Sequence, residues 1–228
     1  MKIWAISDLH LSSAANKPMD VFGREWVNHA EKVRENWDSV VAPDDVVLLP
    51  GDHSWALRIP QALPDLEFIA RRPGTKVLIR GNHDYWWKRT DTNKLRRLVD
   101  PSINLLHRSS ARLGNVGIAG TRGWRLEADD PEQEQDGKIL AREMEYLRES
   151  LGQIADAEVK IAMLHYPPFT VGLKPTEFAD VLREYGVDIL AYGHIHTGGW
   201  LEGNVGGIEY HLVAADHLGF VPGLVFTC

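Results

Sequence analysis

A chain of 228 residues with 44% hydrophobic content can bury one substantial core, so we expect a single domain over residues 1–228. Its 32 acidic and 25 basic side chains give a formal net charge of −7, which argues against general electrostatic binding to nucleic acid. The only cysteine is Cys228, no apolar run is long enough to span a membrane, and residues 1–7 do not resemble a signal peptide, so we expect a cytoplasmic protein without disulfides.

Strand-like apolar runs alternate with helical patterns along the chain, which indicates an α/β fold. The run over residues 2–7 ends at Asp8, and apolar residues between Phe22 and Val41 are then spaced for one face of a helix. The run over residues 45–49 is continuously apolar after Asp45, as expected for a parallel strand covered on both faces. Further strand-like runs are predicted at residues 76–79, 159–164 and 187–192.

Two turns rich in glycine and asparagine predict β-hairpins, at residues 113–116 and at residues 203–207. Residues 127–137 are rich in Asp, Glu and Gln and predict an exposed acidic loop. Residues 138–151 place apolar side chains on one face and predict an amphipathic helix. The loop and helix are candidates for a lid or a dimer contact, and the sequence does not choose between these roles.

Five of the predicted strands end in side chains that commonly bind metal ions. We expect these motifs to share one sheet edge, because the carboxyl ends of parallel strands meet there. Oxygen and imidazole ligands without thiolate suit Mn²⁺, Fe or Zn²⁺, and paired metal ions commonly assist displacement at phosphorus. The sequence therefore predicts two divalent metal ions and hydrolysis of a phosphate ester. The motifs are Asp8-Leu9-His10, Gly51-Asp52, Asn82-His83-Asp84, His165 and His194-Ile195-His196.

These motifs resemble those of the calcineurin-like metallophosphoesterases, and the resemblance spans nearly the whole chain. It implies a four-layer α-β-β-α sandwich with two mixed sheets and a dinuclear metal site at the carboxyl-end sheet edge. In such a site, two cations roughly 3.5 to 4 Å apart share a hydroxide that attacks phosphorus. The implied ligands are Asp8, His10 and His196 for one metal ion and Asn82, His165 and His194 for the other, with Asp52 bridging both.

The resemblance also implies roles for residues beside the ligands. His83 is expected to protonate the leaving oxygen and Asp84 to orient His83, and the alternative role of His83 is to hold the loop through a hydrogen bond. Arg80 is similar in position to a phosphate-contacting arginine of the Ser/Thr phosphatase branch, and a surface ion pair is its alternative role.

Other residues near the motifs are candidates for substrate contact. His53 departs from the family, which commonly has a small or apolar residue there, and its side chain either approaches the metal ions or points away. Several tryptophans could wall a substrate pocket or pack in the core, and two arginines could contact phosphate. These residues are Trp55, Trp86, Trp87 and Trp124, and Arg122 and Arg125.

We therefore expect a phosphohydrolase that acts on a small phosphorylated molecule or nucleotide. A phosphoprotein phosphatase and a nuclease are alternatives, and the absence of a basic track disfavours the nuclease. A metal-binding interaction scaffold is the non-enzymatic alternative, which the complete ligand set disfavours. The sequence leaves open whether monoesters or diesters are cleaved, which metal is bound, and the oligomeric state.

Overall fold

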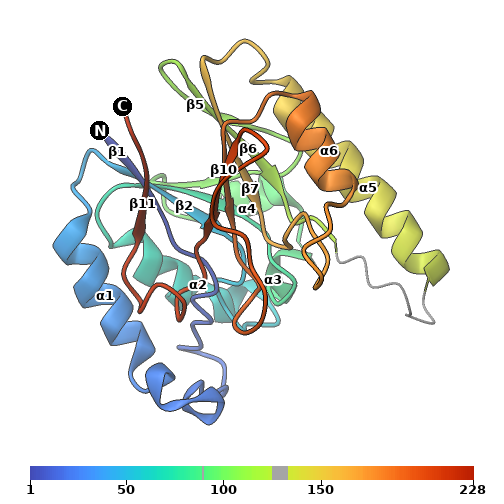
Figure 1. Cartoon of the computed structure of the whole chain (residues 1–228). Helices are drawn as coiled ribbons and strands as arrows, with labels where there is room; N and C mark the ends of the chain where they lie inside the picture. The colour runs from blue at the N-terminus through green and yellow to red at the C-terminus, as the bar shows by residue number, and fades with distance from the viewer. Residues whose placement is uncertain (89, 125–132) are drawn as a thin grey trace.

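The computed structural model describes residues 1–88, 90–124 and 133–228, with the backbone alone over residues 133–136 (Figure 1). Its strands form two sheets, and the two ends of the chain lie side by side because β11 pairs with β1. One sheet has the order β11-β1-β2-β3-β4, with β1 to β4 parallel and β11 antiparallel at its edge. Its strands are β1 (Lys2–Ala5), β2 (Val46–Pro50), β3 (Thr75–Ile79), β4 (Ile103–Leu105) and β11 (Gly223–Thr227).

The second sheet has the order β5-β6-β7-β8-β10-β9, with four parallel strands between antiparallel edges. Its strands are β5 (Ala111–Leu113), β6 (Val116–Thr121), β7 (Val159–Leu164), β8 (Ile189–Tyr192), β9 (Gly203–Val205) and β10 (Ile208–Leu212). The predicted hairpins are confirmed as β5–β6 and β9–β10. Both sheets are mixed, as predicted.

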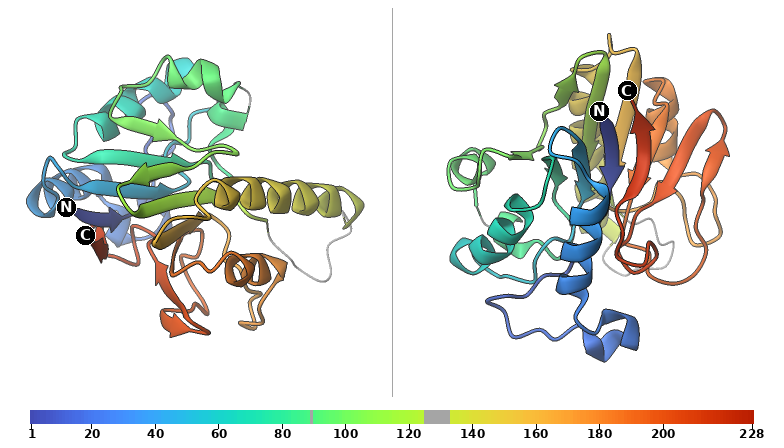
Figure 2. Two further views of the ribbon diagram at one scale, coloured as in Figure 1. Left: turned by 90° about the horizontal axis from the view of Figure 1, so that it is seen from above. Right: turned by 90° about the vertical axis from the view of Figure 1, so that its left-hand side faces the viewer.

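Helices cover the outer faces of the two sheets (Figure 2). Against the first sheet pack α1 (His29–Val40), α2 (Ile59–Ala70), α3 (Tyr85–Lys88) and α4 (Thr92–Arg96). Against the second sheet pack α5 (Gln133–Gly152) and α6 (Glu177–Glu184). Among the described residues, no helix is both long and apolar enough to cross a lipid bilayer.

Alternating side chains on the strands build this layered packing, since successive residues of a strand face opposite sides of the sheet. In β2, Leu48 faces the layer between the sheets, whereas Leu49 packs beneath the helices. In β7, Met163 lies between the sheets and Leu164 packs toward α5 and α6. The continuous apolar runs therefore mark strands that are buried on both faces, and the α/β four-layer sandwich is confirmed.

Two predicted helix boundaries are wrong. The first predicted helix began near Phe22, but the α-helix begins at His29, and residues 20–26 form two short 3₁₀ helices, Asp20–Phe22 and Arg24–Trp26. Phe22 is 59% exposed, so the periodic pattern there does not mark a buried face. The helix α5 begins at Gln133, inside the stretch 127–137 that was predicted as an acidic loop. Residues 127–132 of that stretch lie outside the described residues.

Candidate metal centre

The predicted metal ligands all follow strand ends, but the strands belong to two different sheets. Asp8 follows β1, Asp52 follows β2 and Asn82 follows β3 in the first sheet. In the second sheet, His165 follows β7, and His194 and His196 follow β8. The expectation that all five motifs share one sheet edge is therefore wrong, and the site lies where the ends of two stacked sheets meet.

Asp8, His10 and His196 bring three donor atoms together. The Nε2 atom of His10 lies 3.9 Å from Asp8 Oδ1, and the Nε2 atom of His196 lies 3.8 Å from the same oxygen. Ligands about 2.1 Å from one metal ion are themselves separated by roughly 3 to 4 Å. These three residues, which are the set expected for one metal ion, are therefore spaced to hold a cation.

Asp8, Asp52 and His165 form a second group of this kind. His165 Nε2 lies 3.5 Å from Asp52 Oδ2 and 2.6 Å from Asn82 Oδ1. The other carboxylate oxygen of Asp52 accepts the backbone N–H of His83 at 2.8 Å. Asp52 Oδ2 also lies 3.9 Å from His10 Nε2, so the Asp52 carboxylate stands between the two groups.

A buried carboxylate oxygen tests whether a cation fits these residues. Asp8 is fully buried, and its Oδ2 accepts hydrogen bonds from Ser7 Oγ at 2.5 Å and from the His194 N–H at 3.0 Å. Its Oδ1, which faces His10 and His196, is buried without a hydrogen-bond partner. An unpaired buried acceptor is costly, and a metal ion at Oδ1 would remove that cost. The residues fit a metal ion.

His165 is oriented as a neutral ligand. The oxygen of Pro50 lies 3.0 Å from Nδ1 and accepts its proton, which leaves the Nε2 lone pair toward Asn82 and Asp52. Burial lowers the pKa of His165 to about 3. The Asp52, Asn82 and His165 acceptor atoms therefore converge, an arrangement that a cation stabilises.

The electrostatics of the other ligands favour a cation in the same way. Burial raises the pKa of Asp52 well above its usual range, and the charges of Asp8 and Asp84 add to this effect. Burial also raises the pKa of Asp8. Burial, reinforced by the charge of His165, lowers the pKa of His194 to about 3. Buried, closely spaced carboxyl groups ionise poorly without a metal ion. The charge of a divalent ion favours their ionised form, in which they are strong ligands.

Asp216 supports His196 and was missed in the sequence. Its Oδ1 accepts from Nδ1 of His196 at 2.9 Å, which turns Nε2 toward Asp8. Burial alone would lower the pKa of His196, but the Asp216 hydrogen bond and the charge of Asp8 raise it overall. A signal was present, because Asp216 follows β10, which runs parallel to β8 and ends at the same edge.

Four of the predicted ligands have positive φ angles, which residues other than glycine rarely adopt. Asp8, His10, Asp52 and His194 have φ angles of 56°, 46°, 55° and 71°. The loop of Asp52 approaches the backbone of Gly81 so closely that a side chain would not fit there, since a Cβ atom on Gly81 would lie 2.1 Å from Asp52 Oδ1. Strained backbone of this kind persists where the surrounding structure holds it, commonly at functional sites.

A comparison with protein families gives this geometry its context. Residues 1–198 match the family model described as calcineurin-like phosphoesterase. The chain belongs to the calcineurin-like phosphoesterases. Membership supports metal-dependent hydrolysis of phosphoesters, and it agrees with the resemblance seen in the motifs.

Relatives of this protein include phage proteins. It is 37% identical over 81 residues to the gene 66 protein of Mycobacterium phage L5, covering 36% of this chain and 39% of that protein. It is 38% identical over 84 residues to the gene 66 protein of Mycobacterium phage D29, covering 36% of this chain and 40% of that protein. The matched part thus spans about two fifths of the length of either relative.

Solved structures share the fold at low identity. A phosphopantetheinyl hydrolase from Mycobacterium tuberculosis has a TM-score of 0.58 at 18% identity, over 93% of this chain and 88% of that chain. A protein of unknown function from Aquifex aeolicus has a TM-score of 0.52 at 15% identity, over 98% of this chain and 95% of that chain. These likenesses show the fold alone.

His83 lies beside the predicted ligands without belonging to either donor group. Its ring centroid is 5.7 Å from that of His10 and 4.2 Å from that of Trp55. Burial lowers the pKa of His83, while the charges of Asp84 and Asp8 oppose that effect. The position suits a proton donor that faces the metal centre, and the role itself stays a prediction.

Asp84 does not orient His83, so that expectation is wrong. Its Oδ2 accepts from the N–H groups of Gly81 at 2.8 Å and Asp52 at 3.0 Å, and from His53 Nδ1 at 2.9 Å. Its Oδ1 accepts from the backbone N–H of His53 and from the indole N–H of Trp86. Burial would raise the pKa of Asp84, but the charge and hydrogen bond of His53 lower it overall. Asp84 therefore fixes the Asp52 loop.

Two predicted substrate contacts lie inside the protein. His53 is fully buried, with Nδ1 against Asp84 and Nε2 3.3 Å from the Leu49 oxygen. Trp86 is also fully buried and packs in the core beneath the helices, beside Trp87. Neither side chain reaches the surface of the site, so the structure places both as supports of Asp84 and not as substrate contacts.

Trp55 does lie at the site. Its ring stacks on His10 with centroids 4.9 Å apart and an interplanar angle of 20°, and the Lys17 ammonium lies 4.2 Å from its centroid. Its indole N–H points to the sulfur of Met19 at 3.1 Å. Trp55 therefore holds the His10 ring in place and walls the side of the centre next to His83.

The predicted phosphate-contacting arginines converge on one buried glutamate. Arg122 Nη2 lies 3.3 Å and Arg80 Nη2 lies 3.7 Å from Glu143 Oε1, and Thr121 Oγ1 donates to Glu143 Oε2 at 2.6 Å. The Arg122 guanidinium also lies 4.4 Å from the Trp124 ring. Glu143, which sequence reasoning missed, ties α5 to the end of β6. Arg125 lies outside the described residues.

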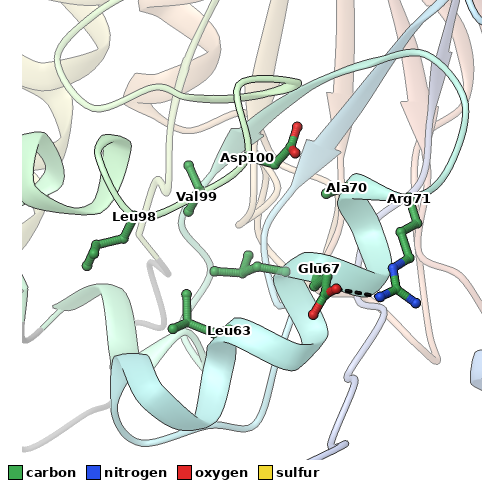
Figure 3. A pocket seen from close by; sticks show the side chains of 8 residues that line it. Leu63, Glu67, Ala70, Arg71, Leu98, Val99 and Asp100 are labelled. Atoms are coloured by element: carbon green, nitrogen blue, oxygen red, sulfur yellow. Dashed lines mark hydrogen bonds and ion pairs between the residues drawn. The ribbon is translucent and has the colours of Figure 1, made fainter.

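Two cavities flank the histidine ligands. One, of about 320 Å³, is lined by Phe22, Trp26, Trp55, His10, His83 and His196, and we name it the His83 cavity. The other, of about 340 Å³, is lined by Tyr166, Phe169, Val171, His194, His196 and Gly199, and we name it the His194 cavity. A hollow of about 570 Å³ between α2 and residues 98–100 contains none of the predicted site residues (Figure 3).

Proposed function

We propose that this protein is a dinuclear metal-dependent phosphohydrolase that acts on a small phosphorylated molecule such as a nucleotide. The observation that carries the proposal is the pair of donor groups, Asp8–His10–His196 and Asp8–Asp52–His165, which share the Asp8 carboxylate. One ion would use only one of these groups. The oxygen and imidazole donors suit Mn²⁺, Fe or Zn²⁺.

The residues divide into ligands and positioning groups in this proposal. Asp52 would serve both ions, because its Oδ2 lies 3.9 Å from His10 Nε2 and 3.5 Å from His165 Nε2. Asn82 and His194 complete the shell around His165. Asp84 and Asp216 position the ligand loop and the His196 ring through the hydrogen bonds described above.

Such a pair of cations, when bound, would lower the pKa of water and supply Lewis acidity toward the phosphoryl oxygens. The chain supplies the remaining parts of the reaction. An oxygen from water becomes bonded to phosphorus, the bond between phosphorus and the leaving oxygen breaks, and His83 gives its proton to that oxygen so that a neutral alcohol departs. Trp55 keeps His83 and His10 in place through its ring contacts.

The surface properties support a small substrate. The formal charge of −7 provides no general attraction for a nucleic-acid backbone. The cavities of about 320 and 340 Å³ beside the ligands are near the lower end of the range of about 300 to 1,000 Å³ that is typical for small-molecule sites.

We also infer that residues 1–228 act as one domain. An apolar layer between the two sheets supports this, because it draws Ile3 and Val225 from the ends of the chain and Met163 from its middle. The cytoplasmic location stays a prediction.

An activity assay with Asp52→Asn tests the proposal. Wild-type protein with Mn²⁺ is expected to hydrolyse aryl phosphoesters, and Asp52→Asn is expected to lower turnover by at least about a hundredfold, since one bridging charge is lost. Asp38→Asn is the matched control, because Asp38 pairs with Arg72 on the surface. Unchanged turnover in pure Asp52→Asn protein would contradict the mechanism.

A further inference from the structure

The two cavities lie on opposite sides of one wall at the metal centre. His196 and Thr197 line both the His83 cavity and the His194 cavity. His10 and His83 line only the first, and His194 lines only the second. A phosphoryl group held by the donor groups between these histidines would have space for an organic substituent on both sides.

The His83 cavity suits a flat aromatic group. Phe22, Trp26, Trp55 and Met19 supply its apolar walls, and Phe22 is 59% exposed at its mouth. The carboxylates of Glu25 and Asp216 also line it, which disfavours an anionic group. Because the cavity contains His83, the proposed proton donor, it is the side on which a leaving alcohol would sit.

The His194 cavity has a different character. Phe169 and Val171 provide apolar surface, Gly199 leaves room beside them, and Val171 is 84% exposed at the edge. No lysine or arginine lines either cavity among the residues that the structure describes. The second negative charge of a phosphomonoester, whose second pKa is about 6, would find no lysine or arginine in either lining, since the Lys17 ammonium over the Trp55 ring lines neither cavity.

We propose that the substrate is a phosphodiester with organic groups on both ester oxygens. The leaving alcohol carries a flat aromatic group that occupies the His83 cavity, and the retained substituent occupies the His194 cavity. This inference rests on the proposed function, because it assumes that phosphorus lies at the metal centre. Water cleaves one ester bond, so the products are the aromatic alcohol and a phosphomonoester that keeps the second substituent.

Three substrates with one leaving group separate the two cavities. They are p-nitrophenyl phosphate, methyl p-nitrophenyl phosphate and phenyl p-nitrophenyl phosphate, assayed with Mn²⁺ on the wild-type protein. We expect kcat/KM to be about tenfold higher for the phenyl diester than for the methyl diester, because the phenyl ring fills the His194 cavity. The monoester is expected to be the poorest substrate.

Substitutions then assign each effect to its cavity. Gly199→Phe is expected to abolish the preference for phenyl over methyl by filling the His194 cavity, and a Cβ atom at Gly199 has no contact closer than 3.6 Å. Val171→Trp narrows the same cavity from an exposed position and serves if the first variant fails to fold. Phe22→Ala is expected to lower kcat/KM for all three substrates by a common factor.

Two controls match these changes. Val205→Phe adds a ring at an exposed position of β9, and Val21→Ala shortens the exposed neighbour of Phe22, so both are expected to keep the wild-type pattern. Hydrolysis that favours the monoester, or equal rates on both diesters in wild type, would overturn the inference while leaving the proposed function intact. Failure to hydrolyse any of the three substrates with any divalent metal would overturn both.

Discussion

At the scale of single residues, Asp84 shows how the centre is held before any ligand binds. It is buried, and it accepts hydrogen bonds from Gly81, Asp52 and His53 at once. Charge-assisted hydrogen bonds of this kind are stronger than those between neutral groups. The strained φ of Asp52 is therefore stabilised by a carboxylate that does not itself face the metal centre.

Gly81 permits the closest approach to Asp52, and this gives a prediction. In Gly81→Ala the new methyl group would meet Asp52 Oδ1 at 2.1 Å and displace the bridging carboxylate. We expect Mn²⁺ affinity, measured by calorimetric titration, to fall by about 10- to 100-fold. Gly152→Ala is the control, because a Cβ atom at Gly152 meets nothing within 4 Å. Equal affinities for the two variants would show that the approach is not needed.

His83 can be tested through the leaving group. If His83 protonates the leaving oxygen, His83→Ala should lower kcat by about 10²- to 10⁴-fold for a phosphoester of an alkyl alcohol. The loss should be much smaller for a p-nitrophenyl ester, whose leaving oxygen needs little protonation. Exposed His107 provides a matched His→Ala control. The same loss with both leaving groups would instead indicate a role in binding.

Residue types and spacing could predict the ligands, but not the roles of their neighbours. Asp8 and His165 follow apolar strands, so strand-end chemistry identified them. Asp84 and His53 also follow such strands, yet a side chain one position from a ligand can turn either way in a loop. Their mutual hydrogen bond joins residues that are 31 positions apart, and no local pattern encodes it.

At the scale of elements, β3 carries a buried lysine that sets a pH dependence. Lys76 is 1% exposed, and its ammonium donates to the carbonyls of Ala70 at 2.8 Å and of Arg72, at the end of α2. Burial lowers the pKa of Lys76 from 10.5 to about 8. Below pH 8 the Lys76 ammonium is therefore charged in both states, and its charge is desolvated in the folded protein but hydrated in the unfolded chain. This difference lowers the free energy of unfolding.

The free energy of unfolding should rise with pH through this window. Between pH 8 and 10.5 the unfolded chain binds the proton more strongly than the folded protein does, so deprotonation favours folding. We expect the wild-type value to gain about 3 kcal/mol relative to Lys76→Met across this range, measured by urea denaturation. Lys174→Met, a change at an exposed lysine, is the control. Because this variant retains Lys76, its free energy of unfolding should rise with pH as that of the wild type does.

The elements themselves were predictable where burial imposes a pattern. The strands β2 and β7 are apolar on both faces, and both hairpins carry their turn residues in the sequence. The start of α1 could not be predicted from the pattern. Phe22 and Trp26 continue the apolar spacing of this helix, but they lie in two separate 3₁₀ helices before it. Trp26 is buried against the site and Phe22 is exposed, so tertiary contacts decided that boundary.

At the scale of the whole molecule, the centre exists because two sheets are stacked with their strand ends together. Asp8 and Asp52 come from one sheet, and His165 and His196 come from the other. The apolar layer between the sheets fixes their relative position, so the core and the metal centre depend on the same packing. The sequence pattern could not assign strands to sheets, since it records which residues are buried but not which strands pair.

The number of metal ions bound by each chain tests the central claim most directly. Metal-free protein would be saturated with Mn²⁺, freed of excess ion, and analysed for manganese per chain by mass spectrometry alongside its hydrolytic rate. We predict two ions per wild-type chain and a rate that follows occupancy of the second ion, with Asp52→Asn binding fewer ions. A fully active wild-type chain that holds a single ion would contradict the dinuclear account.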